Sequence, residues 1–69
     1  MLGKVKWFDE KKGFGFIVAN GKDHFVYFKQ IKGTGFKTLL EGAVVDFDPA
    51  MGVKGMEAHN VRVVVDITE

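Results

Sequence analysis

Turn-forming residues divide this chain of 69 residues into five short segments. Glycine, usually beside a polar residue, marks the turns at residues 11–13, 20–21, 33–35, 41–42 and 51–55. The runs between them are rich in β-branched and aromatic residues and predict strands at residues 2–9, 14–19, 24–28, 43–48 and 56–65. Asn20 and Gly21 favour a hairpin turn between the second and third strands. No run keeps a helical period over three turns, and residues 29–32 are expected to form at most one helical turn.

Five strands in so short a chain predict a small five-stranded antiparallel all-β barrel, because a flat sheet of this size cannot hide its edges. A single domain over residues 1–69 is expected, since the chain is too short for a second core. Gly13 and Gly15 should face inward, where the lack of a side chain permits tight coiling. The residues expected to fill the core are Val5, Ile17, Val26, Ile31, Val45, Phe47, Val61 and Val63.

The composition restricts the class of protein. The chain contains no cysteine, so neither disulfide bonds nor thiolate zinc ligands can supplement the core. No apolar run approaches the ~18 residues of a membrane span, and Lys4 and Lys6 come too early for a signal peptide. These features predict a soluble, cytoplasmic protein.

The charge is small but unevenly distributed. The formal net charge is only +1, which argues against binding dominated by attraction to phosphate. Eight of the ten basic residues lie in the first 37 positions, and six of the nine acidic residues follow them. Two interpretations stay open: one basic and one acidic surface, or an ordinary solvated exterior.

Two pairs of aromatic residues occur at a spacing of two, Phe14 with Phe16 and Phe25 with Tyr27. Side chains alternate between the faces of a strand, so each pair shares a face. If these four rings formed the core, the outward positions of the same strands would be glycine, isoleucine and valine, with nothing polar to meet water. The pattern therefore predicts an outward aromatic patch, and such patches mark binding surfaces.

Three further aromatic residues bear on this patch. Trp7 and Phe8 are adjacent and cannot both follow the alternation, so one should occupy a bulge or the strand end, and we place Trp7 at the patch. Phe36 lies in a glycine-flanked loop before Lys37 and has two open positions, a lid on the patch or an anchor against the barrel end. Rings combined with dispersed lysines form the kind of surface that binds single-stranded nucleic acid.

The same segments resemble motifs of the bacterial cold-shock proteins. The sequence KGFGFI at residues 12–17 resembles the family's first ribonucleoprotein motif, and HFVYF at residues 24–28 resembles the second. KVKWF at residues 4–8, GFKTL at residues 35–39 and the segment at residues 55–61 also fit the family. The resemblance implies an OB-fold barrel that binds single-stranded RNA and DNA and acts as an RNA chaperone, without a cofactor.

The resemblance also assigns residues to nucleic-acid binding. They are Lys6, Trp7, Phe8, Lys12, Phe14, Phe16, Phe25, Phe28, Phe36 and Lys37, with Asp23 and Lys54 at the margin. Asp9, Tyr27 and Met56 complete the expected site but replace the family's usual asparagine, histidine and proline. Lys29 and Gln30 replace the small residues that usually follow the second motif. These departures leave the rings in place and bear on base preference and affinity.

Other classes of function have less support in the sequence. His24 and His59 lie far apart, and no arrangement of catalytic residues suggests itself, so we expect no enzymatic activity. Asp46 and Asp48 share a strand face, where solvated acidic residues are commoner than catalytic pairs. Asp23 precedes His24 directly, and neighbours on a strand point in opposite directions, so no metal site is expected. A small barrel that binds peptides through its aromatic patch remains the alternative to nucleic-acid binding.

The C-terminal run at residues 61–69 is long and β-prone. We expect it to extend the fifth strand and to fray after Asp66. A second hypothesis is that its edge pairs with another copy of the chain and gives a weak dimer of a mainly monomeric protein.

Overall fold

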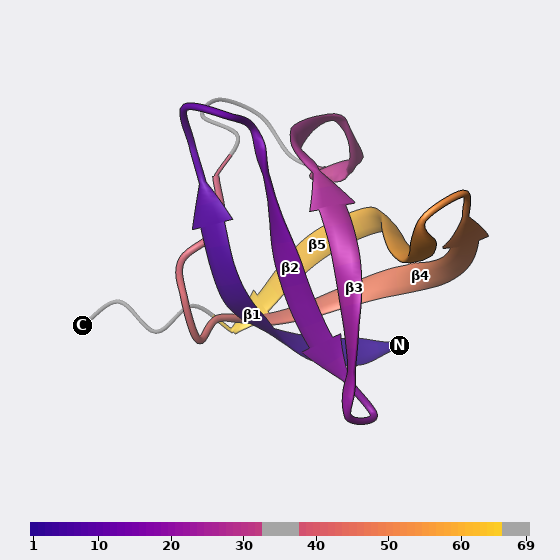
Figure 1. Ribbon diagram of the computed structural model, residues 1–69. Helices are drawn as coiled ribbons and strands as arrows, with labels where there is room; N and C mark the ends of the chain where they lie inside the picture. Colours follow the sequence, from indigo (N-terminus) through magenta and orange to yellow (C-terminus); the bar gives the residue numbers. More distant parts are fainter. Residues whose placement is uncertain (33–37, 66–69) are drawn as a thin grey trace.

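The structure is a computed structural model, and it describes residues 1–32 and 38–65. Five strands and one short 3-10 turn account for most of the described chain (Figure 1). They are β1 (Leu2–Asp9), β2 (Phe14–Ala19), β3 (Lys22–Tyr27), η1 (Phe28–Gln30), β4 (Val44–Gly52) and β5 (Gly55–Val65). All five predicted strands are present. β4 ends later than predicted because β4 and β5 continue as a paired hairpin as far as Gly52 and Gly55.

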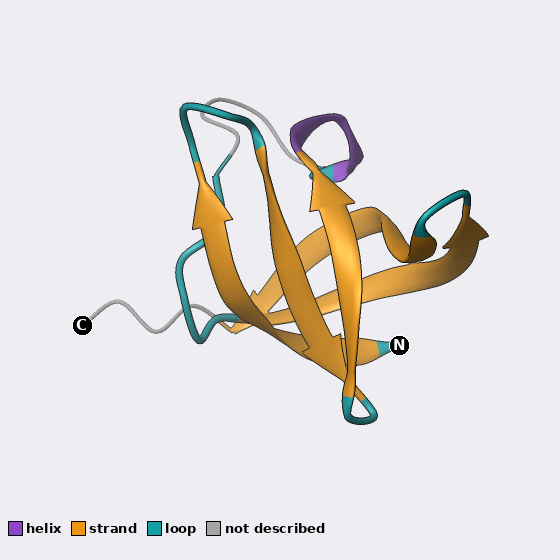
Figure 2. Cartoon of the chain, viewed as in Figure 1, coloured by secondary structure: helices purple, strands orange, loops and turns teal. Residues whose placement is uncertain are grey.

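The strands close into a barrel in the order β1-β2-β3-β5-β4. Four of the five junctions are antiparallel, whereas β3 runs parallel to β5, with Phe25 opposite Glu57. The predicted five-stranded closed barrel is confirmed, and among its five described strand junctions the one between β3 and β5 departs from an antiparallel arrangement. Figure 2 shows how little of the described chain is helical. No helix among the described residues is long and apolar enough to cross a membrane.

The turn between β2 and β3 has the conformation that its sequence predicts. Asn20 and Gly21 have φ values of 53° and 73°, both in the left-handed region. Positive φ at both central residues is the requirement of the type I′ turn, whose twist matches that of the flanking strands. The pairing of Ala19 with Lys22 closes this hairpin.

Among the described residues, eleven apolar side chains are buried in the interior. They are Val5, Ile17, Ala19, Val26, Ile31, Leu39, Ala43, Val45, Phe47, Ala58 and Val61. Seven of the eight predicted core residues are among them, but the prediction for Val63 is wrong, because its side chain is 45% exposed. Val63 lies where the register between β4 and β5 shifts between Val44 and Val45. A bulge bends and twists its strand, so the simple alternation along β5 does not hold there.

His24 is the one buried polar side chain among the described residues. Its Nδ1 lies 3.1 Å from the carbonyl oxygen of Lys22, and its ring meets the edge of Phe47 with centroids 5.1 Å apart. Asp23, the preceding residue, is exposed on the opposite side of the strand. His24 therefore contributes to the interior of the barrel.

Gly15 allows β1 and β2 to approach closely. A Cβ atom at this position would collide with the carbonyl oxygen of Trp7 and would lie 2.7 Å from the Cα of Phe8. Gly13 is also buried, as predicted, and a Cβ there would lie 2.9 Å from a ring carbon of Phe28. The two inward glycines thus give β1 and η1 their positions beside β2.

Candidate nucleic-acid interface

A bulge in β1 decides which aromatic side chain faces outward. Val5 is paired with Ile17, but Trp7 is paired with Phe16, so Lys6 is the extra residue on β1. The shift places Trp7 on the outer face beside Phe16, whereas Phe8 is paired with Gly15 and packs against the core. The predicted position of Trp7 at the patch is confirmed. The bulge was predicted at Trp7 or Phe8, but its extra residue is Lys6, and Trp7 and Phe8 alternate between the two faces of the strand.

Six rings from β1, β2, β3 and η1 form one continuous cluster, which we call the ring platform. Its members are Trp7, Phe14, Phe16, Phe25, Tyr27 and Phe28. Trp7 contacts Phe14 and Phe16 with centroid distances of 5.8 and 5.4 Å. Phe25 continues the cluster at 5.6 Å from Phe14, and the chain of rings ends with Tyr27 and Phe28, 5.0 Å apart. These distances are those of mutually supporting aromatic pairs.

The ring platform faces outward. Trp7, Tyr27 and Phe28 are 39%, 41% and 37% exposed, and the other three rings are half-buried. The opposite face of the same strands carries Ile17 and Val26, both 0% exposed. The prediction that the rings face solvent while the aliphatic residues fill the core is therefore confirmed.

The turn before β2 is held by Asp9. Its carboxylate Oδ1 accepts hydrogen bonds from the backbone amides of Lys11 (2.9 Å) and Lys12 (3.1 Å). Its carbonyl oxygen accepts a further bond from the amide of Gly13 at 2.7 Å. The amide of Phe28 in turn donates to the carbonyl of Gly13 at 2.8 Å. Asp9 thus fixes the turn that supports Phe28. The carboxylate Oδ1 of Asp9 is already hydrogen-bonded to backbone amides.

Lysines border the ring platform. Lys6, at the bulge, contacts Asp23 with 3.1 Å between Nζ and Oδ2, and both side chains are exposed. Exposed pairs of this kind stabilise a fold by at most about 1 kcal/mol, so Lys6 is able to exchange Asp23 for a phosphate. Lys12 and Lys54 are also exposed.

A shallow hollow separates the ring platform from the tip of the β4–β5 hairpin. It has a volume of about 350 Å³ and is lined by Phe16, Asp23, Phe25, Lys54, Gly55, Met56 and Glu57. We call it the hairpin hollow. Five of these residues belong to the predicted site: Phe16, Asp23, Phe25, Lys54 and Met56. Glu57 was not predicted. No sequence signal identifies Glu57, because its place depends on the parallel junction between strands far apart in the chain.

The remaining predicted site residues have different positions. Phe8 packs against the core instead of joining the outer rings. Phe36 and Lys37 lie outside the described residues, as do the residues after Val65. The structure therefore brings together most of the predicted site, with Phe8 behind it.

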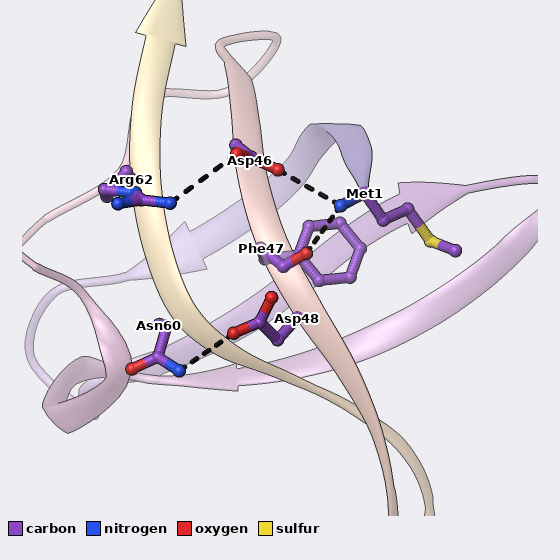
Figure 3. A network of polar contacts seen from close by, with 6 residues as sticks. All are labelled: Met1, Asp46, Phe47, Asp48, Asn60 and Arg62. Carbon is purple, nitrogen blue, oxygen red and sulfur yellow. Dashed lines mark hydrogen bonds and ion pairs between the residues drawn. The ribbon is translucent and has the colours of Figure 1, made fainter.

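The carboxylates of β4 have structural partners (Figure 3). Asp46 accepts a hydrogen bond from the N-terminal ammonium of Met1 at 3.1 Å and lies 3.7 Å from Arg62. The ammonium, by hydrogen bond and charge, holds the pKa of Asp46 below its usual value, and Arg62 adds to this effect. Asp48 accepts a bond of 2.9 Å from the side-chain amide of Asn60. Within the described ranges, no group of three or more metal-ligating side chains is found.

The sequence profile described as "'Cold-shock' DNA-binding domain" matches residues 1–64. The chain belongs to the cold-shock domain family. The resemblance seen in the ribonucleoprotein motifs is thereby confirmed, and the closed five-stranded barrel agrees with the OB-fold of the family. Family membership supports nucleic-acid binding by this cold-shock domain.

Curated relatives agree with this assignment. The chain is 55% identical over 65 residues to the cold shock-like protein of Thermotoga maritima, and the matched region covers 93% of this chain and 98% of that protein. It is 54% identical over 63 residues to the major cold shock protein CspA of Pseudomonas aeruginosa, covering 90% of this chain and 91% of the relative. It is 56% identical over 64 residues to the cold shock-like protein CspC of Escherichia coli, and the matched region covers 90% of this chain and 93% of the relative.

Proposed function

We propose that residues 1–69 form a single cold-shock domain that binds single-stranded RNA and DNA and acts as a passive RNA chaperone in the cytoplasm. The observation that carries this proposal is the ring platform, six contiguous rings on an outer face with lysines beside them. Every base has a ring face, so stacking on such a surface tolerates any sequence.

Stacking supplies the binding energy in this proposal. Each stacked base contributes about 1–3 kcal/mol. Several bases on the ring platform would therefore give micromolar or tighter affinity after the costs of ordering the strand. Lys6, Lys12 and Lys54 would contact phosphates or base edges around the rings, and Phe8 would support Trp7 and Phe16 from behind.

The free energy of stacking per base also predicts how much RNA structure this chaperone can open. Opening one duplex step costs on the order of 1.4 kcal/mol, which is similar to the gain from stacking one base. The protein would trap strands that open spontaneously and would destabilise weak hairpins without ATP. If stoichiometric protein melted a stable duplex of about twenty base pairs, the passive mechanism would be wrong.

We propose a monomer as the main working form, with weak self-association through β5. Val63 and Val64 are exposed on this strand and offer an apolar surface. A sedimentation experiment at high protein concentration tests this point, and monomer alone would exclude the association.

Fluorescence of Trp7 tests the proposed function directly, because the chain contains one tryptophan. Titration with a short oligouridine should quench Trp7 in a saturable manner, since a base stacked on the platform would contact its ring. The control is a Val53→Ala variant, in which oligouridine should quench Trp7 as in the wild type. Val53 is fully exposed in the β4–β5 turn and carries no ring. Absence of quenching at tens of micromolar would contradict the proposal and favour peptide binding at the same patch.

A further inference from the structure

Glu57 lies at the edge of the ring platform. It is the partner of Phe25 across the parallel junction of β3 and β5. Directly opposed residues in a sheet project from the same face, so the carboxylate of Glu57 and the ring of Phe25 are neighbours on the outer surface. Glu57 is half-buried and lines the hairpin hollow together with Phe16 and Lys54. A base stacked on Phe25 would therefore extend an edge toward Glu57.

The polar groups of the hairpin hollow differ in what they are already bound to. Oε1 of Glu57 lies 2.9 Å from Nε2 of His59, and Asp23 is bound by Lys6 at 3.1 Å. Lys54 has no ion-pair partner within the part of the chain that the structure describes. The carboxylate of Glu57 extends over Gly52, in the space that a side chain at position 52 would fill. Each carboxylate oxygen has two lone pairs, so Oε1 can accept a hydrogen bond from a base while it contacts His59. The hollow thus offers a carboxylate and an ammonium to one base.

A carboxylate accepts hydrogen bonds and donates none, whereas an ammonium only donates. Single-stranded bases are read at their Watson–Crick edges. Guanine presents two adjacent donors on that edge, N1–H and the 2-amino group, beside the O6 acceptor. Uracil presents one N–H between two carbonyls, and cytosine and adenine present one amino group beside an unprotonated ring nitrogen. Guanine alone matches two carboxylate oxygens and a neighbouring ammonium.

We infer that the hairpin hollow selects guanine in a single strand, with Glu57 accepting from N1–H and the 2-amino group and Lys54 donating to O6. This inference rests on the proposed function. A bidentate contact between a side chain and a base discriminates by a factor that begins at about fivefold, and partial exposure of Glu57 favours this lower end. The expected preference for guanine over uracil at one position is therefore about fivefold.

The test measures affinities for three hexamers by quenching of Trp7: oligouridine, the same strand with one central guanosine, and the same strand with inosine there. Inosine lacks the 2-amino group but keeps N1–H and O6. The affinities should decrease in the order guanosine, inosine, uridine. Equal affinities for guanosine and inosine would overturn the inference without any variant.

Two variants test whether the carboxylate of Glu57 causes the preference for guanosine over uridine. Glu57→Gln keeps the shape but gives an amide that donates as well as accepts, so the guanosine-to-uridine ratio should fall to about two or less. Gly52→Ala should also lower the ratio, because the new methyl group displaces the carboxylate without removing its charge. Glu41→Gln is the matched control, since it removes the same charge from an exposed turn outside the hollow and should leave the ratio unchanged.

The outcomes separate this inference from the proposed function. If the wild type binds all three hexamers and Glu57→Gln keeps the wild-type ratio, the inference is wrong and the proposed function stands. If no hexamer quenches Trp7, the proposed function itself fails. Thermal unfolding of each variant establishes that a changed ratio does not reflect loss of the fold.

Discussion

Phe25 and Glu57 lie opposite each other where β3 runs parallel to β5, so an aromatic ring and a carboxylate share one outer face. This junction joins the first three strands, which carry the ring platform, to the last strand, which carries the far wall of the hairpin hollow. The surface for stacking and the groups able to read a base edge are thus combined by the closure of the barrel.

Removal of one ring should weaken binding more than removal of one lysine. Phe16→Ala deletes a ring that contacts both Trp7 and Phe25, and we expect a loss of about 1–3 kcal/mol in binding free energy. Lys12→Ala removes one exposed charge and should cost less. Titration of Trp7 fluorescence measures both variants. Equal losses would mean that stacking does not dominate.

The salt dependence of binding should be shallow. Lys6, Lys12 and Lys54 are the lysines beside the described interface, and about three phosphate contacts predict a slope near −2 for log affinity against log salt. A fourfold rise in salt should therefore lower the affinity by about 16-fold. Titrations at several salt concentrations give the slope. A value of about −5 or steeper would show that phosphate attraction has been underestimated.

Gly15→Ala should destabilise the barrel. The added methyl group would collide with the backbone of Trp7 and Phe8 on the neighbouring strand, and backbone atoms cannot move aside as side chains do. We expect the free energy of unfolding to fall by about 1–3 kcal/mol, as for other overpacked sites. Thermal or urea unfolding measures the change. Val64→Ala, at an exposed position of β5, should stay within about 0.5 kcal/mol of the wild type.

The ionised form of Asp46 should stabilise the fold at neutral pH. The N-terminal ammonium lowers the pKa of Asp46 below its usual value of 3.8, so the folded state binds this proton more weakly than the unfolded state does. The stabilisation is therefore complete above the usual pKa and is lost as the pH falls through the lowered pKa of the folded state.

Asp46→Asn should accordingly reduce stability at neutral pH and lose this effect in strong acid. Urea unfolding of the variant and the wild type at pH 7 and near pH 2 measures the difference. The surface location makes the effect small, and Glu41→Gln serves as the control because Glu41 is exposed and lies in a turn. A difference that persists unchanged in strong acid would exclude the ammonium contact as its cause.

Much of the fold could be predicted from local patterns. Alternation of apolar residues and the Asn20–Gly21 turn predict the strands and the β2–β3 hairpin, whereas the bulge in β1 was expected at Trp7 or Phe8 and has Lys6 as its extra residue. These patterns work because they depend on one strand at a time. The outward face of the rings follows for the same reason, since Val26 and its neighbours had to fill the interior.

Features that depend on contacts between distant segments could not be predicted. Leu39 and Ala43 are buried although they lie in the loop before β4, and Val63 is exposed at a register shift. Glu57 reaches the site only because β5 runs parallel to β3. The role of Asp9 was also hidden, because the sequence does not reveal that its carboxylate is bound by backbone amides.

The position of β5 in the chain has a consequence during synthesis. β5 is the last strand described, and it supplies both the closing partner of β3 and one wall of the hairpin hollow. A growing chain that still holds β5 in the ribosome can therefore neither close the barrel nor complete the interface. The complete interface exists only once β5 has emerged and paired with β3.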